Sequence, residues 1–316
     1  MKKTTVLIVG AGPAGAACAR RLQQAGVDFL LLDQQPFPRM KSCAGWITPA
    51  VLRAIGFQPG QYPYSFTTFS KFIISVRGVR ITLPVRQYAI RRIEFDHWLL
   101  QRNTLTVEQH TVKHIRQTAD GYEIDGKFTS QYLVGAGGTY CPVYRSLFRE
   151  AVPRAKDRMI VALEEEFPYP CEDADCRLWF MENGLPGYAW YVPKANGWLN
   201  VGIGAKAEKL KEKGGDIQAR WQALTAKLDA IGLVRGHTYQ PLSHTYFLRS
   251  RMDIPIRIKN AFLAGDAAGL ATLDMGEGIG PALLSGFRAA EAIITGENYS
   301  LAGIPRYSLP TIVWGK

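Results

Sequence analysis

The first 33 residues hold the feature that most constrains the fold, a glycine-rich segment set between an apolar run and a helix-forming run. Val6–Val9 is wholly apolar, as expected for a strand buried on both faces. Gly10–Gly15, with the sequence GAGPAG, follows at once and leads into a helix-forming stretch that ends near Gly26. A second apolar run, Phe29–Leu32, is closed by Asp33. This order of strand, GxGxxG, helix, strand and acid is typical of a dinucleotide-binding βαβ unit.

Each residue type in this unit has a physical reason. Gly10 permits the tight turn, Gly12 lets the backbone approach a pyrophosphate, and Gly15 lets the helix pack closely on the strand. The unpaired N–H groups and partial positive charge of the helix start face the phosphates. Asp33 accepts the ribose hydroxyls, and hydrogen bonds to a charged group contribute about 1.5–3 kcal/mol each. A glycine turn alone can be purely structural, but its position between two apolar strands, with an acid after the second, favours cofactor binding. The expected cofactor-binding residues here are Gly10, Gly12, Pro13, Ala14, Gly15 and Asp33.

Composition places the chain among ordinary globular proteins and restricts its partners. The 316 residues are 47% hydrophobic and 21% charged, enough for one large domain or two interleaved ones. The net charge of +11 favours acidic partners, namely a phosphate-bearing cofactor, an anionic membrane surface or an acidic redox protein. The alternative is a basic surface that is only solvated and has no specific partner. Nucleic acid is disfavoured because no binding motif accompanies the charge.

Cysteine usage and hydropathy indicate the compartment. The chain has five cysteines, an odd number without the paired spacing of a disulfide framework or a zinc site, so we expect a reducing compartment and no metal. No apolar stretch reaches about 18 residues, so no membrane span is expected. We therefore expect a cytoplasmic protein, with peripheral membrane contact as one use of its basic surface.

The rest of the chain alternates between strand-rich and helical segments. Residues 66–85 are predicted to form two strands turned at Arg77-Gly78, and residues 159–204 several aromatic-rich strands. Helices are predicted at 49–55, 93–100, 216–231 and 281–295, and a last buried strand at 261–264. The first sheet is completed only by strands far along the chain. We expect an α/β fold with an α+β insert, in which a nucleotide-binding Rossmann-like domain interleaves with an antiparallel-sheet substrate domain.

A second glycine-bearing strand end lies near the carboxyl end of the chain. Asn260–Gly269, NAFLAGDAAG, carries Gly265-Asp266, and the segment MGEGIG leads into the last helix. This pair of motifs resembles the FAD site of flavoproteins built like para-hydroxybenzoate hydroxylase. The resemblance implies FAD as cofactor, with Asp266 on a ribityl hydroxyl and the backbone of Gly278 and Ile279 beside the flavin pyrimidine. The expected FAD-binding domain comprises residues 1–62, 90–158 and 250–316, and the substrate domain 63–89 and 159–249.

Two further elements of that family are present, the first of them in altered form. In the stretch that begins at Gly135, Gly137 replaces the usual aspartate and Cys141 the usual serine. Because the family ties this stretch to pyridine nucleotide, direct use of NAD(P)H is in question and a redox protein is the alternative electron donor. Arg92-Ile93-Glu94-Phe95-Asp96 resembles the family's Arg-x-x-Phe-Asp element, whose arginine approaches FAD. The expected cofactor-binding set is completed by Gly265, Ala44 and Val112.

Two segments resemble the geranylgeranyl reductase branch of these flavoproteins. Cys43-Ala44-Gly45 is similar to a cysteine–small–glycine loop beside the isoalloxazine, with Trp46 where glycine is common. The segment YAWYVP, which contains Tyr188 and Trp190, resembles the Tyr-x-Trp-x-Phe-Pro motif of the substrate cavity. The resemblance implies that Cys43 donates a proton beside reduced flavin and that Tyr188 and Trp190 bind an apolar substrate. A small cysteine under a loop and ordinary strand packing are the plain alternatives.

Three functions follow from these residues. The first is an FAD-dependent reductase of carbon–carbon double bonds in an isoprenoid or other apolar substrate. The second is a flavin monooxygenase, either an aromatic hydroxylase or a halogenase-like enzyme, since Trp190-x-Val192-Pro193 partly resembles a halogenase motif. The third is a flavoprotein maturation factor that acts on a protein partner.

Overall fold

The computed structural model describes residues 1–56, 58–250 and 254–314, which form two compact units. Unit 1 comprises residues 1–39, 95–154 and 247–308, and unit 2 comprises residues 40–94, 155–246 and 309–316. Both units are therefore assembled from separate chain segments, as the interleaved organisation predicts. The units differ from the expected domains in assigning residues 40–62, 90–94, 155–158 and the last eight residues to unit 2, and residues 247–249 to unit 1. Of the expected range 250–316, residues 251–253 and 315–316 lie outside the described part of the chain.

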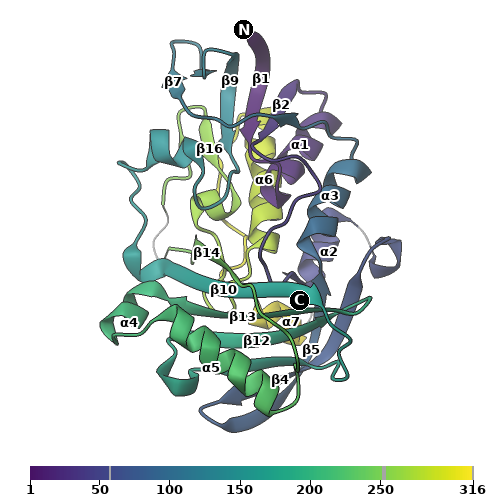
Figure 1. Cartoon of the computed structure of the whole chain (residues 1–316). Coiled ribbons are helices and arrows are strands. Elements are labelled where there is room, and N and C mark those ends of the chain that lie inside the picture. Colours follow the sequence, from purple (N-terminus) through teal and green to yellow (C-terminus); the bar gives the residue numbers. More distant parts are fainter. Residues whose placement is uncertain (57, 251–253, 315–316) are drawn as a thin grey trace. The chain divides into compact units, whose positions relative to one another are not determined.

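Unit 1 is built on a mainly parallel sheet with the strand order β15-β16-β9-β1-β2-β6 (Figure 1). The central strand β1 pairs in parallel with β2 on one side and with β9 on the other, and its apolar residues are buried. A hairpin of β7 and β8 extends the sheet from β9. The strands of this sheet are β1 (Lys2–Val9), β2 (Phe29–Asp33), β6 (Glu108–Gln109), β7 (Ile115–Gln117), β8 (Tyr122–Ile124), β9 (Phe128–Gly135), β15 (Arg257–Ile258) and β16 (Ala261–Leu263).

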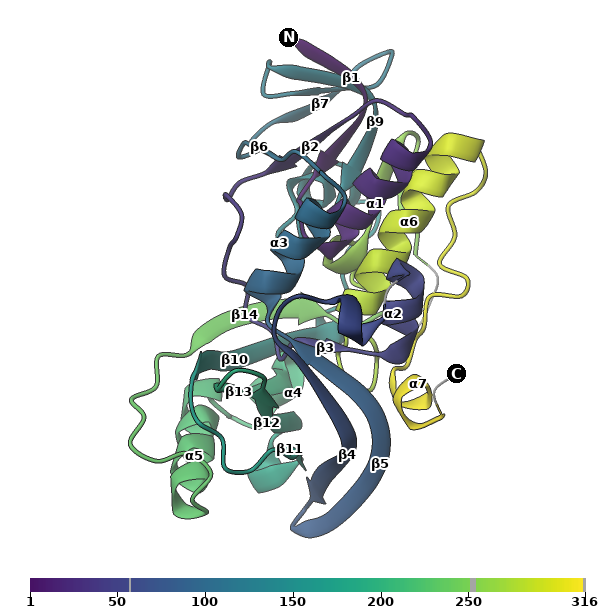
Figure 2. The same ribbon diagram turned by 90° about the vertical axis from the view of Figure 1, so that its right-hand side faces the viewer.

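Helices α1 (Pro13–Gln24) and α6 (Ile279–Thr295) pack side by side in unit 1 (Figure 2). Their close approach depends on a small residue, because a Cβ at Gly286 would lie 2.1 Å from the Ala14 carbonyl oxygen. Helix α6 begins two residues before the predicted 281–295. Helix α3 (Arg92–Arg102), a π-helical turn (Tyr144–Phe148) and a short 3-10 turn (Gly265–Ala268) complete the helical elements of this part.

Unit 2 contains a second sheet with the strand order β14-β10-β13-β12-β11-β4-β5-β3. It is antiparallel except where β11 pairs in parallel with β4, which the sequence analysis did not anticipate. The strands are β3 (Trp46–Ile47), β4 (Phe66–Val76), β5 (Val79–Ile90), β10 (Met159–Pro168), β11 (Cys176–Phe180), β12 (Gly187–Lys194), β13 (Trp198–Lys206) and β14 (Leu242–Phe247).

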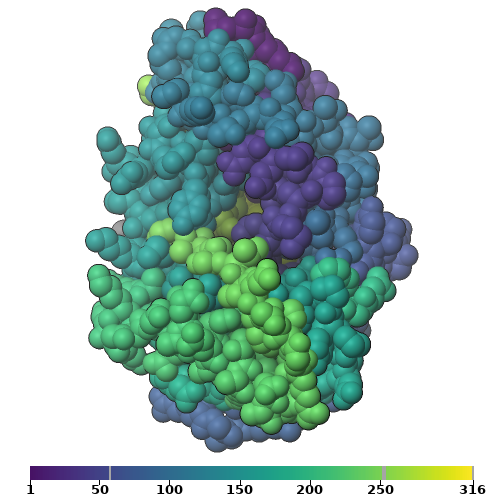
Figure 3. All heavy atoms as spheres, viewed as in Figure 1, coloured from purple at the N-terminus to yellow at the C-terminus, as the bar shows by residue number. Residues whose placement is uncertain are grey.

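The helices of unit 2 are α2 (Pro49–Ile55), α4 (Ala207–Glu212), α5 (Ile217–Ala230) and α7 (Leu309–Trp314), the last of which was not predicted. One face of the sheet packs against α5 through Trp221, Leu224 and Leu228. Figure 3 shows the segment from α4 to β14, in green, on the surface of unit 2 in this view. Within the described ranges, no helix combines the length and apolar character that crossing a membrane requires.

The two faces of the unit 2 sheet carry different residues. Odd-numbered residues of β10, β12 and β13, such as Leu163, Tyr191 and Val201, belong to the apolar core under α5. Because side chains alternate along a strand, the even-numbered residues of the same strands lie on the opposite face. We call this second face the polar–aromatic face, because it carries Glu164, Glu166, Tyr188, Trp190, Lys194 and Asn200.

Candidate functional site

The glycine-rich turn of unit 1 has the geometry predicted from its sequence. Gly10 has a φ of +106°, and a Cβ there would lie 2.4 Å from the Ala136 carbonyl oxygen. A Cβ at Gly15 would lie 1.8 Å from the Gly10 carbonyl oxygen, so the helix rests directly on the turn. Asp33 is buried at the end of β2 and accepts a hydrogen bond of 2.8 Å from the Ala11 N–H. The carboxylate is thereby fixed beside the turn.

The second motif lies beside the first in unit 1. Gly265 has a φ of +61°, and its N–H donates to the Ser285 hydroxyl of α6 at 2.8 Å. A Cβ at Gly278 would lie 3.3 Å from Asp266 Oδ1, so the carboxylate of Asp266 is close to the start of α6. Since α6 packs on α1, residues about 250 positions apart in the sequence form one site. The resemblance assigns these residues to the two ends of FAD.

The start of α1 fits an anionic group. Gly12 is the N-cap residue of α1, no side chain caps the helix there, and the first turn contains no acid. A Cβ at Gly12 would lie 3.4 Å from Arg39 Nη2. Arg39 is largely buried, and its Nε has no hydrogen-bond partner among the described residues. A phosphate at this position satisfies both the guanidinium and the helix N–H groups. Sequence reasoning missed Arg39, which lies in an irregular loop.

The start of α6 has a carboxyl cap that the sequence analysis did not anticipate. Glu277 is buried and accepts a hydrogen bond of 2.6 Å from the Gly280 N–H. Burial, with smaller contributions from Asp274 and Asp266, raises the pKa of Glu277 to about 7, against the hydrogen bonds from Gly280 and Ile279. Gly278 and Ile279 lie at the start of α6 next to this carboxyl group, and their place beside a flavin stays a prediction.

Arg154 joins two loops of the same unit. Its guanidinium donates to the Ala267 carbonyl oxygen at 2.8 Å and to the Asp266 carbonyl oxygen at 3.4 Å. It also donates to the carbonyl oxygen of Thr139 and lies over the Tyr144 ring. Arg154 thus ties the stretch after β9 to the turn that carries Asp266. Cys141, in that stretch, is fully buried and packs where a Cβ on Gly135 would fall, so its role there is structural.

The remaining predicted cofactor residues are divided between the units. Val112 is buried in unit 1, after β6. Ala44 and Arg92 belong to unit 2, where Arg92 is buried at the start of α3. The structure therefore groups the glycine motifs, Asp33 and Asp266 within one unit. The assignment of Ala44, Arg92 and Val112 to FAD stays a prediction.

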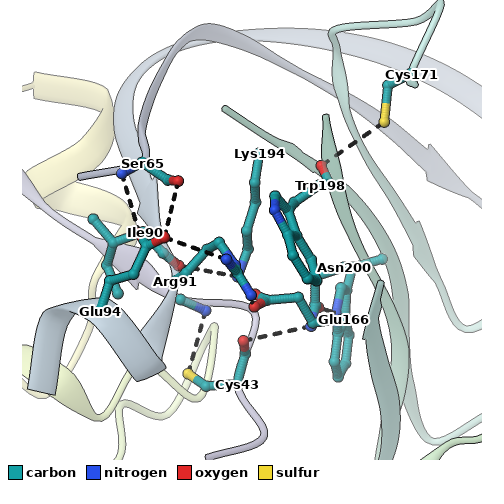
Figure 4. A network of polar contacts seen from close by, with 12 residues as sticks. Cys43, Ser65, Ile90, Arg91, Glu94, Glu166, Cys171, Lys194, Trp198 and Asn200 are labelled. Carbon is teal, nitrogen blue, oxygen red and sulfur yellow. Dashed lines mark hydrogen bonds and ion pairs between the residues drawn. The ribbon is translucent and has the colours of Figure 1, made fainter. Parts of the chain in front are cut away.

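The Cys43 loop is held on the polar–aromatic face of unit 2. The Cys43 thiol is partly exposed and accepts a hydrogen bond of 3.3 Å from the Gly45 N–H. The Cys43 carbonyl oxygen accepts from Asn200 Nδ2 at 3.5 Å, and Asn200 Oδ1 accepts from Trp190 Nε1 at 2.7 Å. Gly45 has a φ of +73°, and a Cβ there would lie 2.0 Å from the Ile90 carbonyl oxygen. In Figure 4 a dashed line joins the Cys43 carbonyl oxygen to Asn200.

Aromatic rings gather on the same face. Tyr188 is stacked on Trp46, with ring centroids 6.4 Å apart and ring planes 4° apart. It also contacts Phe180 at 4.9 Å and Trp190 at 5.7 Å. Tyr188 and Trp190, two positions apart on β12, therefore point to one side of the sheet. Trp46, the departure from the family loop, is part of this cluster, which we call the aromatic cluster.

A network of ion pairs borders the aromatic cluster (Figure 4). Lys194 is 1% exposed and pairs with Glu166 Oε2 at 2.5 Å, while it also donates to the Ile90 carbonyl oxygen. Arg91 Nε pairs with Glu166 Oε1 at 2.9 Å, and the Arg91 guanidinium reaches Glu94 at 3.2 Å. Both oxygens of Glu166 are therefore occupied, and the buried Lys194 ammonium is compensated.

Glu164 and His244 differ from that network because they lack partners. Glu164 on β10 is 1% exposed, and neither of its carboxyl oxygens has a hydrogen-bond partner among the described residues. His244 on the neighbouring β14 places Nδ1 3.6 Å from Glu164 Oε1, beyond hydrogen-bond distance. Burial raises the pKa of Glu164 to about 7 and lowers the pKa of His244 to about 3, the latter with help from Lys41 and Arg92. Sequence reasoning missed both residues.

Comparison with known proteins agrees with this arrangement. Residues 8–72 match the family model described as an NAD(P)-binding Rossmann-like domain. An uncharacterized protein of Methanosarcina barkeri is 30% identical over 93% of this chain and 75% of its own length. The geranylgeranyl diphosphate reductase of Rhodobacter capsulatus is 26% identical over 92% of this chain and 75% of its own length.

Solved structures share the fold. A geranylgeranyl bacteriochlorophyll reductase-like protein of Thermoplasma acidophilum superposes with a TM-score of 0.80 at 21% identity, over 93% of this chain and 78% of that one. The monooxygenase-type flavoprotein PqsL of Pseudomonas aeruginosa superposes with a TM-score of 0.69 at 19% identity, over 92% and 86% of the two chains. The chain therefore belongs to the geranylgeranyl reductase family of FAD-dependent oxidoreductases, and it is an enzyme.

Proposed function

We propose that this enzyme reduces carbon–carbon double bonds of an isoprenoid or another apolar substrate. The observation that carries the proposal is the aromatic cluster of Trp46, Phe180, Tyr188 and Trp190, which lies on the same face of one sheet as the Cys43 loop. An aromatic surface with few polar groups suits an apolar chain. Relatives named menaquinone reductase and geranylgeranyl diphosphate reductase support this substrate class.

FAD, when bound and reduced, supplies the hydride for such a reduction. In unit 1, Asp33 and the α1 start hold the adenosine and phosphate end, and Asp266 holds the ribityl chain. In unit 2, the hydrogen bonds from Trp190 through Asn200 to the Cys43 carbonyl oxygen fix the thiol-bearing loop. The Cys43 thiol then provides the proton that the second carbon of the double bond requires. The electrons come from NAD(P)H or from a redox protein.

The test is reoxidation of the reduced enzyme without oxygen. The purified flavoprotein is photoreduced anaerobically and mixed with a prenyl substrate such as geranylgeranyl diphosphate or a menaquinone. Return of the oxidised flavin spectrum together with loss of a double bond supports the reductase. A strict requirement for oxygen with an oxygenated product identifies a monooxygenase instead. Absence of both reactions, with a stable complex with another protein, identifies the maturation factor.

Replacement of Cys43 tests its role separately. Cys43→Ser keeps the small polar side chain but raises the pKa of the donor, so reoxidation by the substrate slows by tenfold or more while FAD content stays unchanged. The measurement is single-turnover absorbance in an anaerobic stopped-flow instrument. Equal rates in the variant and the wild type identify Cys43 as a structural residue.

A further inference from the structure

Three consecutive glutamates of β10 have different surroundings. Glu165 faces the α5 side, where it accepts a hydrogen bond of 2.5 Å from the Gln240 N–H and lies 3.0 Å from His237. Glu166, on the polar–aromatic face, is paired with Lys194 and Arg91. Glu164 lies on the same face as Glu166, yet both of its oxygens lack hydrogen-bond partners among the described residues. An unpartnered buried acid is costly, so a fold has no structural reason to keep one.

The space around Glu164 is shaped by the neighbouring strands. Gly202 lies directly opposite Glu164 in the register of β10 and β13, and a Cβ on Gly202 would lie 2.3 Å from the Trp190 ring and 2.7 Å from Glu164 Cβ. The Trp190 indole therefore packs over Gly202 against the stem of Glu164. This contact places the carboxyl group at the border of the aromatic cluster.

His244 bounds the other side of the carboxyl group. Its side chain is 20% exposed, whereas that of Glu164 is 1% exposed, so the imidazole is the more accessible of the two groups. His244 Nδ1 is itself buried without a hydrogen-bond partner in the described part of the chain. His244 Nδ1 and Glu164 Oε1 are 3.6 Å apart, and neither has a hydrogen-bond partner among the described residues. A third group that hydrogen-bonds to both would satisfy them.

The charges nearby favour an uncharged partner. Lys41, Lys194 and the Asn200 amide favour the ionised form of Glu164, while Glu166 and burial oppose it. Lys41 and Arg92 oppose protonation of His244. Lys194 is itself bound to Glu166 and the Ile90 carbonyl oxygen. Between about pH 3 and pH 7 both groups are uncharged, so an uncharged oxygen can bond to them without a charge being buried, whereas an apolar group leaves both polar atoms unsatisfied.

We propose that Glu164 and His244 form a subsite for an uncharged oxygen, a hydroxyl or carbonyl group, on the otherwise apolar substrate. The proposal deepens the proposed function, because it rests on an apolar ligand bound at the aromatic cluster. The carboxyl and imidazole hold the oxygen, while the rings of Trp190 and Tyr188 contact the hydrocarbon. This subsite selects one orientation of a chain whose double bonds are otherwise alike.

Binding of a matched pair of isoprenoids to the FAD-loaded enzyme tests the subsite. Farnesol carries a terminal hydroxyl, and α-farnesene has a similar hydrocarbon skeleton without oxygen. Affinities are measured by tryptophan fluorescence, since six of the seven tryptophans belong to unit 2. Glu164→Met removes the hydrogen-bonding group at similar length, Glu164→Gln keeps it, and Glu165→Gln on the opposite face is the matched control.

We expect Glu164→Met to weaken farnesol binding about tenfold and to leave α-farnesene binding unchanged. We expect Glu164→Gln to bind farnesol with an affinity close to that of the wild type, and the Glu165→Gln control to bind it with the same affinity. Equal affinity of the wild type and Glu164→Met for farnesol overturns the subsite, as does a parallel loss of farnesol and α-farnesene. If farnesol binds the wild type and Glu164→Met equally, and both probes bind tightly, the subsite is wrong but the proposed function stands. Failure of the wild type to bind either probe overturns both proposals for isoprenoids.

Discussion

The unpartnered carboxyl of Glu164 leads to a prediction about stability that needs no ligand. The pKa of Glu164 is raised from 4.5 to about 7 in the folded protein, and burial is the main cause. Below pH 4.5 the side chain is protonated in both the folded and the unfolded state, so it makes no pH-dependent contribution. Between pH 4.5 and 7 the unfolded chain loses the proton and the folded chain keeps it. Stability therefore falls as pH rises through this interval.

The size of the effect follows from the shift. Each pKa unit corresponds to 1.36 kcal/mol, so a rise from 4.5 to about 7 corresponds to a loss of about 3 kcal/mol that is complete above pH 8. Glu164→Gln does not titrate and is free of this loss. We expect the stability of Glu164→Gln, relative to the wild type, to increase by about 3 kcal/mol from pH 4.5 to pH 8.

The assay is urea unfolding at a series of pH values, followed by tryptophan fluorescence, which reports mainly on unit 2. The free energy of unfolding of the wild type must be compared with that of Glu164→Gln at each pH, because other groups titrate in both proteins. The pKa of Glu277 is also raised to about 7, and the pKa of His244 is lowered to about 3. The His244 contribution has the opposite direction, since its protonation in the unfolded chain lowers stability as pH falls below 6.5. A difference that stays constant from pH 4.5 to pH 8 would refute the reasoning.

Three other substitutions test the remaining parts of the site. Asp33→Asn is expected to lower FAD affinity at least tenfold, measured as flavin absorbance retained after dialysis, because hydrogen bonds to a charged group contribute about 1.5–3 kcal/mol each. Gly202→Ala places a Cβ 2.3 Å from the Trp190 ring and is expected to cost roughly 1–3 kcal/mol in urea unfolding; an unchanged midpoint contradicts the packing. Lys194→Met leaves Glu166 with one partner and is expected to cost about 1–3 kcal/mol, less than the 3–5 kcal/mol of an isolated buried pair. Equal stability of this variant at pH 8 argues against the pair.

The strand, turn and helix of the first glycine motif were predictable because their signals are local. The turn at Gly10, the helix after it and the acid Asp33 lie within 24 consecutive residues, and each has a conformational or charge requirement that few residue types meet. The pairing of this unit with Gly265 was also predictable, since both segments end apolar strands of one parallel sheet. The hairpin at Arg77-Gly78 and the helix near Pro49 were confirmed for the same reason.

The partners within unit 2 were not predictable from spacing. Whether a glutamate of β10 is paired depends on which strands flank it. The order β14-β10-β13 brings Glu164 together with Asn200 and His244, which are 36 and 80 positions away in the sequence. Glu164, Asn200 and His244 carry no local signal that distinguishes them from surface residues. The sequence LEEEF at positions 163–167 places three consecutive glutamates between two apolar residues, and this pattern does not indicate the face that holds the unpaired acid.

The two experiments on Glu164 together separate a binding residue from a structural one. A residue that stabilises the fold lowers both stability and ligand affinity when it is replaced, because its partners are left unsatisfied. Neither carboxyl oxygen of Glu164 has a hydrogen-bond partner among the described residues, and His244 Nδ1 lies 3.6 Å from Oε1. Replacement of Glu164 by Gln is therefore expected to stabilise the ligand-free enzyme at pH 8, and its replacement by Met to weaken binding of an oxygenated ligand alone. A gain in stability from Glu164→Gln together with a selective loss of affinity from Glu164→Met is the result that a purely structural carboxyl does not give.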